Sequence, residues 1–270
     1  MFNFDTIIVA PFQQGQKLSG FNKGAGVIYD IMNGKKTNLE LDTVPQTYSG
    51  KSTDDINDDY QSLFETCKKH DKYVLLGGDH SIGQPSVAAS LEKIDPKNLY
   101  VIWIDAHGDI NTYKESKSKN LHGMPLAGLV GYEKPWVNTK KKLLKTNLLY
   151  FGLRDADDFE MRKITKDKIF YTSIIETLIQ KINDIIVSNN NAVFHVSWDV
   201  DSLDPIYMDS TGCRVPNGLK PIHVVMAINY VKNRMIALDI VEYNSEIGTD
   251  ESKLTSVCSM NDILTQIMLV

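Results

Sequence analysis

Short apolar runs alternate with amphipathic segments along most of the chain. Seven runs rich in Val, Ile, Leu and aromatic residues are predicted to be strands: Thr6–Ala10, Tyr73–Leu76, Leu99–Ile104, Leu148–Gly152, Ile169–Thr172, Ala192–Trp198 and Ile236–Val241. The runs lack the strict polar–apolar alternation of a half-exposed sheet. This pattern favours parallel strands that are buried on both faces.

Three amphipathic segments are predicted to be helices. The first has apolar residues at helical spacing behind the acidic pair Asp54-Asp55: Ile56, Tyr60, Leu63, Phe64 and Cys67. The second stripe runs from Ile174 to Ile186, and the third runs from Leu254 to Met268 behind Thr249-Asp250-Glu251. Strands that alternate with helices predict an α/β fold, and the absence of a linker or repeat predicts a single three-layer domain over residues 1–270.

Charge and hydropathy argue against two classes of partner, nucleic acids and membranes. The net charge is -5 and the pI is about 5.7, so we expect no nucleic-acid partner. The basic run Lys140–Lys142 is interpreted as a solvated helix face. No stretch approaches the ~18 apolar residues of a membrane span, so no membrane partner is expected.

The cysteines and the N-terminal segment favour a cytoplasmic location. Cys67, Cys213 and Cys258 are an odd number without metal-type spacing, which favours a reducing environment over a disulfide framework. The segment that begins MFNFDTIIVA has no basic residues before its apolar stretch, so no secretory signal is expected. We therefore expect a cytoplasmic protein.

Carboxylates and imidazoles follow five of the predicted strands. The segments are Gly77–Ser81, Asp105–Asn111, Leu153–Asp157, Asp199–Pro205 and Glu242–Asn244. Parallel sheets bind ligands beyond the carboxyl ends of their strands, which puts these segments at one edge. Clustered anionic groups repel one another unless a cation lies among them.

The spacing of these residues predicts a metal centre. Asp105, His107 and Asp109 are two residues apart and would share one side of an extended chain, as would Asp199 and Asp201. With His80 they make four carboxylates and two imidazoles, a set suited to two divalent ions that share bridging carboxylates. Mixed oxygen and nitrogen ligands favour Mn²⁺, with Co²⁺, Ni²⁺ or Fe²⁺ as alternatives, and the lack of thiolates argues against structural zinc.

Each motif alone is weaker evidence for a metal site than the motifs taken together. Asp-x-His-x-Asp and Asp-x-Asp also occur outside metal sites, and Gly-Gly-Asp-His lacks the Gly-Lys-Ser/Thr ending of a phosphate loop. Their order at successive strand ends carries the prediction. Among the other histidines, His195 is interpreted as a satisfied core residue, whereas His122 lies in a Gly-flanked turn where an imidazole of ordinary pKa could shuttle protons.

At these residues the sequence resembles the ureohydrolases, the family of arginase, agmatinase and their relatives. The resemblance is sharp from Tyr73 to Gly248, with a weaker echo at Gly20–Gly24. It implies one α/β domain around an eight-stranded parallel sheet and two Mn²⁺ ions per chain. It also implies that a metal-bridged hydroxide attacks the guanidinium carbon and releases urea and an amine.

The resemblance also assigns roles to individual residues. His80 and Asp109 resemble ligands of the first ion, and His107 and Asp201 resemble ligands of the second. Asp105 and Asp199 resemble the bridging carboxylates. It further implies three catalytic roles: Asp109 carries a proton, His122 shuttles protons to solvent, and Glu242 orients the guanidinium.

Within the family, the sequence is most like arginase. Asp109–Thr112, Ser118 and Asn120–Gly123 resemble the arginase loop without a gap, and Gly152–Asp157 with Glu160 resembles a second arginase segment. In that pattern Asn111 and Ser118 face the α-carboxylate of L-arginine, and Asp157 and Glu160 lie near its α-amino group. Agmatine has no carboxylate to bind, and agmatinases typically lack this loop.

Three features depart from the arginase pattern. Cys213 stands where a Thr usually lies beside the guanidinium, and Asn244-Ser245 replaces Asn-Pro. The chain also ends at Val270, without the longer tail that many arginases use at subunit contacts. The resemblance implies a homo-oligomer, a trimer or hexamer. The short tail argues against that assembly, because it lacks a segment that contributes to the subunit contacts.

Other activities are compatible with parts of this pattern. The nearest alternatives are an agmatinase, a guanidinobutyrase and a formimidoylglutamase. A catalytically silent regulatory relative would lack metal ligands, and all six are present here. A single-metal deacetylase would not need the second set of ligands.

Overall fold

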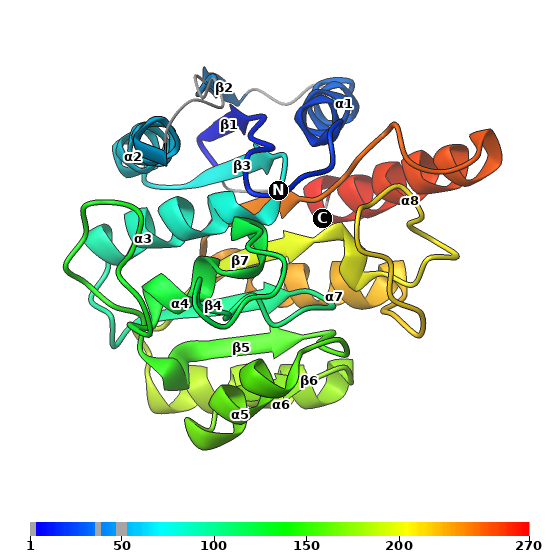
Figure 1. Ribbon diagram of the computed structural model, residues 1–270. Helices are drawn as coiled ribbons and strands as arrows, with labels where there is room; N and C mark the ends of the chain where they lie inside the picture. The colour runs from blue at the N-terminus through cyan, green and yellow to red at the C-terminus, as the bar shows by residue number, and fades with distance from the viewer. Residues whose placement is uncertain (1–3, 36–38, 47–52, 270) are drawn as a thin grey trace.

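Strands and helices alternate along most of the chain in the computed structural model (Figure 1), which describes residues 4–35, 39–46 and 53–269. The strands are β1 (Thr6–Ala10), β2 (Glu40–Thr43), β3 (Tyr73–Gly77), β4 (Leu99–Ile104), β5 (Leu148–Phe151), β6 (Phe170–Thr172), β7 (Val193–Asp199) and β8 (Met235–Val241). The α-helices are α1 (Phe21–Asn33), α2 (Thr53–Lys69), α3 (Gly83–Lys93), α4 (Pro125–Leu129), α5 (Asp158–Lys166), α6 (Ile175–Ser188), α7 (Pro221–Val231) and α8 (Asp250–Leu269).

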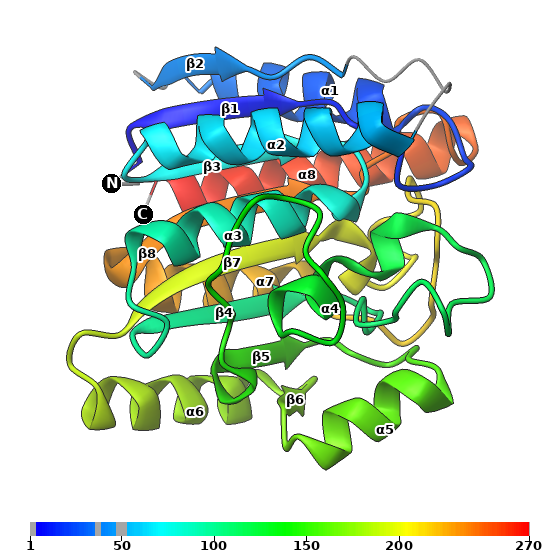
Figure 2. The same cartoon turned by 60° about the vertical axis from the view of Figure 1, so that its left-hand side comes forward.

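All eight strands form one parallel sheet in the order β2-β1-β3-β8-β7-β4-β5-β6. Their carboxyl ends lie along the same edge, on the right in Figure 2. The central strands β3, β8, β7 and β4 are neighbours, although β3 and β4 are consecutive in the sequence. The predicted α/β fold with a parallel sheet of about eight strands is confirmed.

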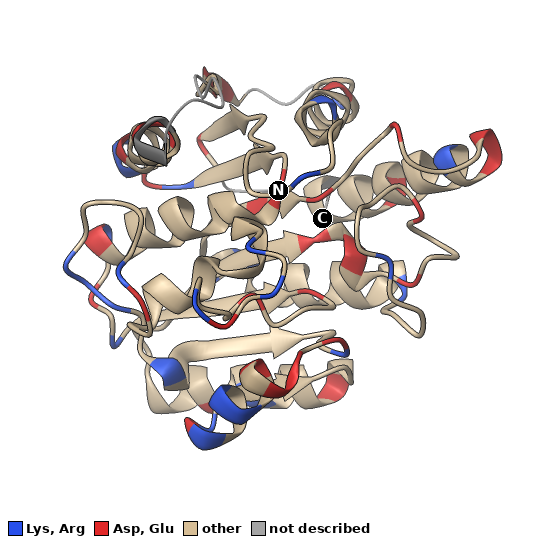
Figure 3. Cartoon of the chain, viewed as in Figure 1, with Lys and Arg blue, Asp and Glu red and all other residues tan. Residues whose placement is uncertain are grey.

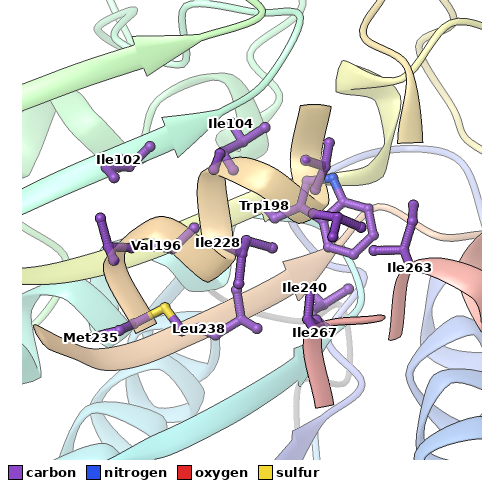
Figure 4. Packing of buried hydrophobic residues seen from close by; sticks show 14 of the residues in the cluster. Ile102, Ile104, Val196, Trp198, Ile228, Met235, Leu238, Ile240, Ile263 and Ile267 are labelled. Carbon is purple, nitrogen blue, oxygen red and sulfur yellow. The ribbon is translucent and has the colours of Figure 1, made fainter. Parts of the chain in front are cut away.

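Helices cover both faces of the sheet and bury two hydrophobic clusters. One cluster packs α1, α6, α7 and α8 against one face, and the other packs α2, α3 and α4 against the opposite face. Figure 4 shows part of the first cluster, in which Trp198 of β7 and Ile240 of β8 lie close to Ile263 and Ile267 of α8. The strands are apolar on both sides because both sides face helices.

The seven predicted strands occur within one residue of their predicted bounds, and the three predicted helices also form. Cys67 is buried, as expected for the apolar stripe of α2. The side chains of Asp54 and Asp55, the predicted acidic start of α2, lie outside the described residues. The buried core position predicted for His195 is confirmed, since its ring hydrogen-bonds to Ser90 Oγ and Asp239 Oδ2, each at 2.9 Å.

Several elements differ from the sequence predictions. β2 was not predicted, because it is an edge strand without buried side chains. β6 is the other edge strand and is only partly buried, not buried on both faces. The run Lys140–Lys142 lies in a loop, not on a helix, so that interpretation was wrong.

Along the ribbon in Figure 3, Lys and Arg positions are dispersed over loops and helices and intermixed with Asp and Glu positions. No helix among the described residues combines the length and hydropathy of a membrane-spanning segment.

Candidate metal centre

Three strands deliver the candidate ligands to one edge of the sheet, and a fourth, β8, adds Glu242 beside them. His80 follows β3, Asp105 follows β4, and Asp199 is the last residue of β7. Glu242 follows β8, which lies between β3 and β7. The loops after these strands converge because parallel strands end at the same edge.

The first group of ligands surrounds the imidazole of His80. The Nδ1 atom lies 3.0 Å from Asp105 Oδ2, 3.2 Å from Asp109 Oδ2 and 3.2 Å from Asp199 Oδ2. This nitrogen is buried without a hydrogen-bond partner. The opposite ring nitrogen, Nε2, is 2.9 Å from Ser197 Oγ, and this contact fixes the ring so that Nδ1 faces the carboxylates.

Trp103 provides a second restraint on the same ring. Its indole stacks on the imidazole of His80, with centroids 4.0 Å apart and planes 6° from parallel. The indole Nε1 donates a hydrogen bond of 2.9 Å to Asp105 Oδ2. One buried side chain of β4 therefore positions two of the candidate ligands.

The second group of ligands surrounds His107 and shares a residue with the first. His107 Nδ1 lies 3.0 Å from Asp201 Oδ2 and 3.4 Å from Asp105 Oδ1. Asp105 therefore turns one oxygen toward each imidazole. The ligand atoms of His80, Asp105 and Asp109 lie within 4.8 Å of one another, as do those of Asp105, His107 and Asp201.

These residues fit divalent cations. Ligand bonds of about 2.1 Å, typical of nitrogen and oxygen ligands, place neighbouring ligand atoms about 3 Å apart, and the spacings around His80 match that value. Burial and the nearby carboxylates of Asp201 and Asp105 raise the pKa of Asp199 well above its usual value. A cation among these groups would relieve that repulsion.

The backbone that brings the ligands together is not the extended chain that the two-residue spacing suggested. Asp109 has a φ of 49°, in the left-handed region that side chains other than glycine seldom adopt. Asp201 lies in a 3₁₀ turn, Val200–Ser202, that begins with the Asp199 side chain accepting the N–H of Asp201. The residues singled out by their spacing do lie close together, but turns, not an extended chain, bring the last candidate ligand of each motif into place.

Glu242 and His122 form a buried pair beside the ligands. Glu242 Oε1 lies 3.0 Å from His122 Nδ1 and accepts the backbone N–H of His80 at 2.8 Å. Glu242 Oε2 accepts a hydrogen bond of 2.8 Å from Gln16 Nε2. Although burial opposes the charge, the carboxylate of Glu242 raises the pKa of His122 to about 9, which differs from the ordinary pKa that the sequence suggested.

The pairing of His122 with Glu242 leads to a testable prediction of how the protonation of His122 and the stability of the metal-free protein depend on pH. We expect His122 to lose its proton near pH 9, and Glu242→Gln to lower that pKa because the neutral amide no longer stabilises the imidazolium. The pair then stabilises the fold fully below about pH 6.5, the unshifted pKa, and loses this contribution as the pH rises through about 9. NMR titration of the histidine ring would measure both pKa values, and an unchanged pKa in Glu242→Gln would contradict the pairing.

A cavity of about 150 Å³ opens onto the ligands and is lined by His107, Asp109, Asn111, His122, Gly123, Asp155, Glu160, Asp199, Asp201 and Cys213. Asn111, Glu160 and Cys213 thus lie near the candidate ligands, and their contact with a substrate stays a prediction. Ser118 and Asp157 are exposed and do not line the cavity. Burial raises the pKa of the Cys213 thiol to about 12, so the thiol is protonated at neutral pH.

Asp157 and Glu160 have a structural role that the sequence analysis did not assign. They form the capping box of α5: the Asp157 side chain accepts the N–H of Glu160, and the Glu160 side chain accepts the N–H of Asp157. Asp157 Oδ2 also accepts a 3.0 Å hydrogen bond from Asn111 Nδ2. The Asp-x-x-Glu spacing before a helix was the sequence signal for this motif.

Three further polar residues of the site were missed as candidates. Asp155 lines the cavity, 3.8 Å from His107 Nε2, and Gln16 holds Glu242. Asp79 is fully buried beside the first group and accepts backbone N–H bonds from Gly15 and Ser81. Burial and the charge of Glu242 raise the pKa of Asp79 to about 6. Asp79 and Asp155 adjoin the motifs, whereas nothing in the sequence connected Gln16 with Glu242.

Comparisons of the sequence with known proteins identify one family. The family model described as "Arginase family" matches residues 7–269. The arginase of Plasmodium berghei is 32% identical over 88% of this chain and 82% of its own length. The arginase of Staphylococcus aureus is 36% identical over 69% of this chain and 65% of its own length.

Solved structures have the same fold. The arginase of Entamoeba histolytica in complex with L-ornithine superposes with a TM-score of 0.88 at 25% identity, covering 100% of this chain and 99% of its own. A putative agmatinase from Clostridium difficile gives a TM-score of 0.77 at 21% identity, covering 100% of this chain and 98% of its own. The second likeness shows the fold alone.

Proposed function

Since the chain belongs to the arginase family of hydrolases, we propose that it cleaves the guanidinium group of L-arginine to urea and L-ornithine at a dinuclear metal centre. The observation that carries the proposal is Asp105, whose two carboxylate oxygens face two different imidazoles. A shared carboxylate between two ligand groups is the arrangement that a pair of ions requires. A site for one ion would not need the second group.

Six side chains would hold the two ions: His80, Asp105, His107, Asp109, Asp199 and Asp201. Their nitrogen and oxygen atoms suit Mn²⁺, with Co²⁺, Ni²⁺ or Fe²⁺ as alternatives. When bound, two such ions supply Lewis acidity that lowers the pKa of water and stabilises developing negative charge.

The remaining groups handle protons and orient the substrate. His122 lines the cavity. Because its Nδ1 atom is hydrogen-bonded to Glu242, its Nε2 atom would exchange protons with solvent. Asp109 also lines the cavity, where its carboxylate can carry a proton to the departing amine. Glu242 is held on both oxygens and does not line the cavity, so it would act on the guanidinium cation as a fixed negative charge beside the cavity.

Substrate selection would take place at the outer end of the cavity. Asn111 lines it and uses one N–H of Nδ2 for Asp157, which leaves a second N–H for a substrate carboxylate. Glu160 and Cys213 also line the cavity, whereas Ser118 and Asp157 would need the substrate to extend to its rim. The L-ornithine in the Entamoeba arginase is the amino-acid product that this proposal expects here.

Two variants of Asp157 would separate its role in capping α5 from its proposed role in substrate binding. Asp157→Ala should lower the free energy of unfolding by about 0.5–2 kcal/mol, because α5 loses its N-cap. Asp157→Ser keeps a capping oxygen but removes the charge, so we expect near-normal stability and a raised KM for L-arginine. Denaturant unfolding and steady-state kinetics separate the two effects. A normal KM in Asp157→Ser would leave this residue with the capping role only.

The proposed function is tested by urea release from L-arginine, agmatine and 4-guanidinobutyrate in parallel with Mn²⁺-loaded protein. We expect L-arginine to have the highest kcat/KM, because the other substrates leave polar groups at the cavity rim unpaired. Equal or better kcat/KM on agmatine would reject arginase and leave the broader ureohydrolase assignment. If L-arginine turnover is weak, Cys213→Thr should improve it.

If no guanidino substrate releases urea, formimidoylglutamate would be tested for release of formamide, and inactivity on it as well would support a catalytically silent relative. Assembly into a homo-oligomer remains a prediction.

A further inference from the structure

The guanidinium of Arg154 is bound by backbone carbonyls from three segments of the chain. It donates to the carbonyls of Gly152 (3.2 Å), Asp201 (2.8 Å), Ser202 (3.1 Å), Leu203 (3.3 Å), Val215 (2.8 Å) and Pro216 (3.2 Å). Three of these carbonyls belong to the turn that carries Asp201. Two others follow Cys213, which lines the cavity.

The backbone of the same residue contacts the loop after β4. The N–H groups of Arg154 and Asp155 both donate to the carbonyl of Ala106, at 2.9 Å each. Ala106 lies between Asp105 and His107. Arg154 thus touches the backbone of both loops that supply the second ligand group, defined as Asp105, His107 and Asp201.

This contact pattern is not explained by an ion pair or by substrate binding. The side-chain hydrogen bonds of Arg154 among the described residues all go to backbone carbonyls, and Arg154 does not line the cavity. Its five N–H groups are directed at carbonyls in the fixed planar fork of a guanidinium. A Lys ammonium keeps the charge but is a single point that cannot reach carbonyls on several sides.

We propose that Arg154 is a positioning residue that sets the second ligand group by holding the Asp201 turn against the Ala106 backbone and the segment after Cys213. The inference rests on the proposed dinuclear centre and deepens it. The first group shares Asp105 with the second, but its His80 ring is restrained without Arg154, by Ser197 and Trp103. Loss of the guanidinium should therefore affect the two ions unequally.

The test is titration of metal-free protein with Mn²⁺ alone, followed by calorimetry and by electron paramagnetic resonance, for Arg154→Lys and the wild type. We expect the wild type to bind two ions and to give the signal of a coupled pair. In Arg154→Lys, one ion should bind about 10–100-fold more weakly, the usual effect of losing a group that supports metal ligands. The spectrum should then be that of an isolated ion at intermediate loading.

Arg234→Lys is the matched control. Arg234 also donates to backbone carbonyls, of Asn190 and Ala192, but it lies before β8 at the opposite end of the strands. Its loss should lower thermal stability and leave both Mn²⁺ affinities unchanged. Circular dichroism of the metal-free variants establishes that they fold. Arg154→Gln, which keeps two amide hydrogens, replaces Arg154→Lys if the latter does not fold.

Selective weakening of one ion in the Arg154 variant but not in Arg234→Lys would support the proposal. Two unchanged affinities, or equal weakening of both, would overturn it. Fewer than two ions in the wild type would instead refute the dinuclear centre itself, so the two failures are distinguishable.

Discussion

Asp199→Asn is expected to remove tight binding of at least one Mn²⁺ ion and to lower kcat on L-arginine by on the order of 10³-fold or more. The change keeps the size of the side chain but removes the charge that faces His80 Nδ1 at 3.2 Å. Loss of one preorganised electrostatic group in an active site typically costs 10²–10³-fold, and a lost ion removes more than one such interaction. Elemental analysis and urea release measure the two effects.

Two comparisons make the result specific to the ligand. Asp184→Asn, on the exposed side of α6, should leave metal content and kcat unchanged. Ser197→Ala removes the hydrogen bond that holds His80 Nε2 and should weaken metal binding by about 10–100-fold. If Asp199→Asn retained two tightly bound ions and normal turnover, this carboxylate would not be a ligand.

Chelation of the ions should also destabilise the wild type. Each ion that binds only the folded state stabilises it by about 2.7 kcal/mol at a free concentration of 100 Kd. Thermal unfolding with and without a chelator measures this difference.

His122→Ala is expected to keep both ions and to lower kcat by about 10²–10⁴-fold, the usual contribution of general acid–base catalysis. The ring lines the cavity and pairs with Glu242, and among the described residues it forms no hydrogen bond or ion pair with a candidate ligand side chain. Steady-state kinetics and metal analysis on the same preparation test both parts.

Two further variants separate proton transfer from the support that His122 gives to Glu242. Imidazole added to His122→Ala should restore part of kcat if proton transfer is the lost function. His122→Asn offers a hydrogen-bond donor for Glu242 without a titratable ring, so it should restore KM more than kcat. Loss of metal from either variant would assign His122 to the support of the ligands instead.

The fold was predictable where the two faces of a segment differ in polarity and unpredictable where they do not. α7 is apolar on nearly every side and α3 is buried along most of its length, so neither shows the stripe of a half-exposed helix. β2 lacks the contrast for the opposite reason, because neither of its faces is buried: it is an edge strand that pairs with β1 alone. Sequence patterns report the contrast between two faces, and these elements lack it.

The site was predictable as a set of residues but not as a geometry. Strand ends identified the six candidate ligands, because parallel strands bring their carboxyl ends together. The φ of Asp109 and the turn at Asp201 depend on contacts with other segments. The Arg154 contacts with residues 201–203 and 215–216 likewise join distant parts of the chain, which spacing within one motif cannot reveal.

The central claim is tested most directly by adding Mn²⁺ stepwise to metal-free protein and measuring, in the same samples, the ions bound per chain and urea release from L-arginine. The account predicts that the rate rises to its maximum as the content reaches two ions per chain, with one L-ornithine formed for each urea. A maximal rate at one ion per chain, or no urea from L-arginine at two, would contradict it.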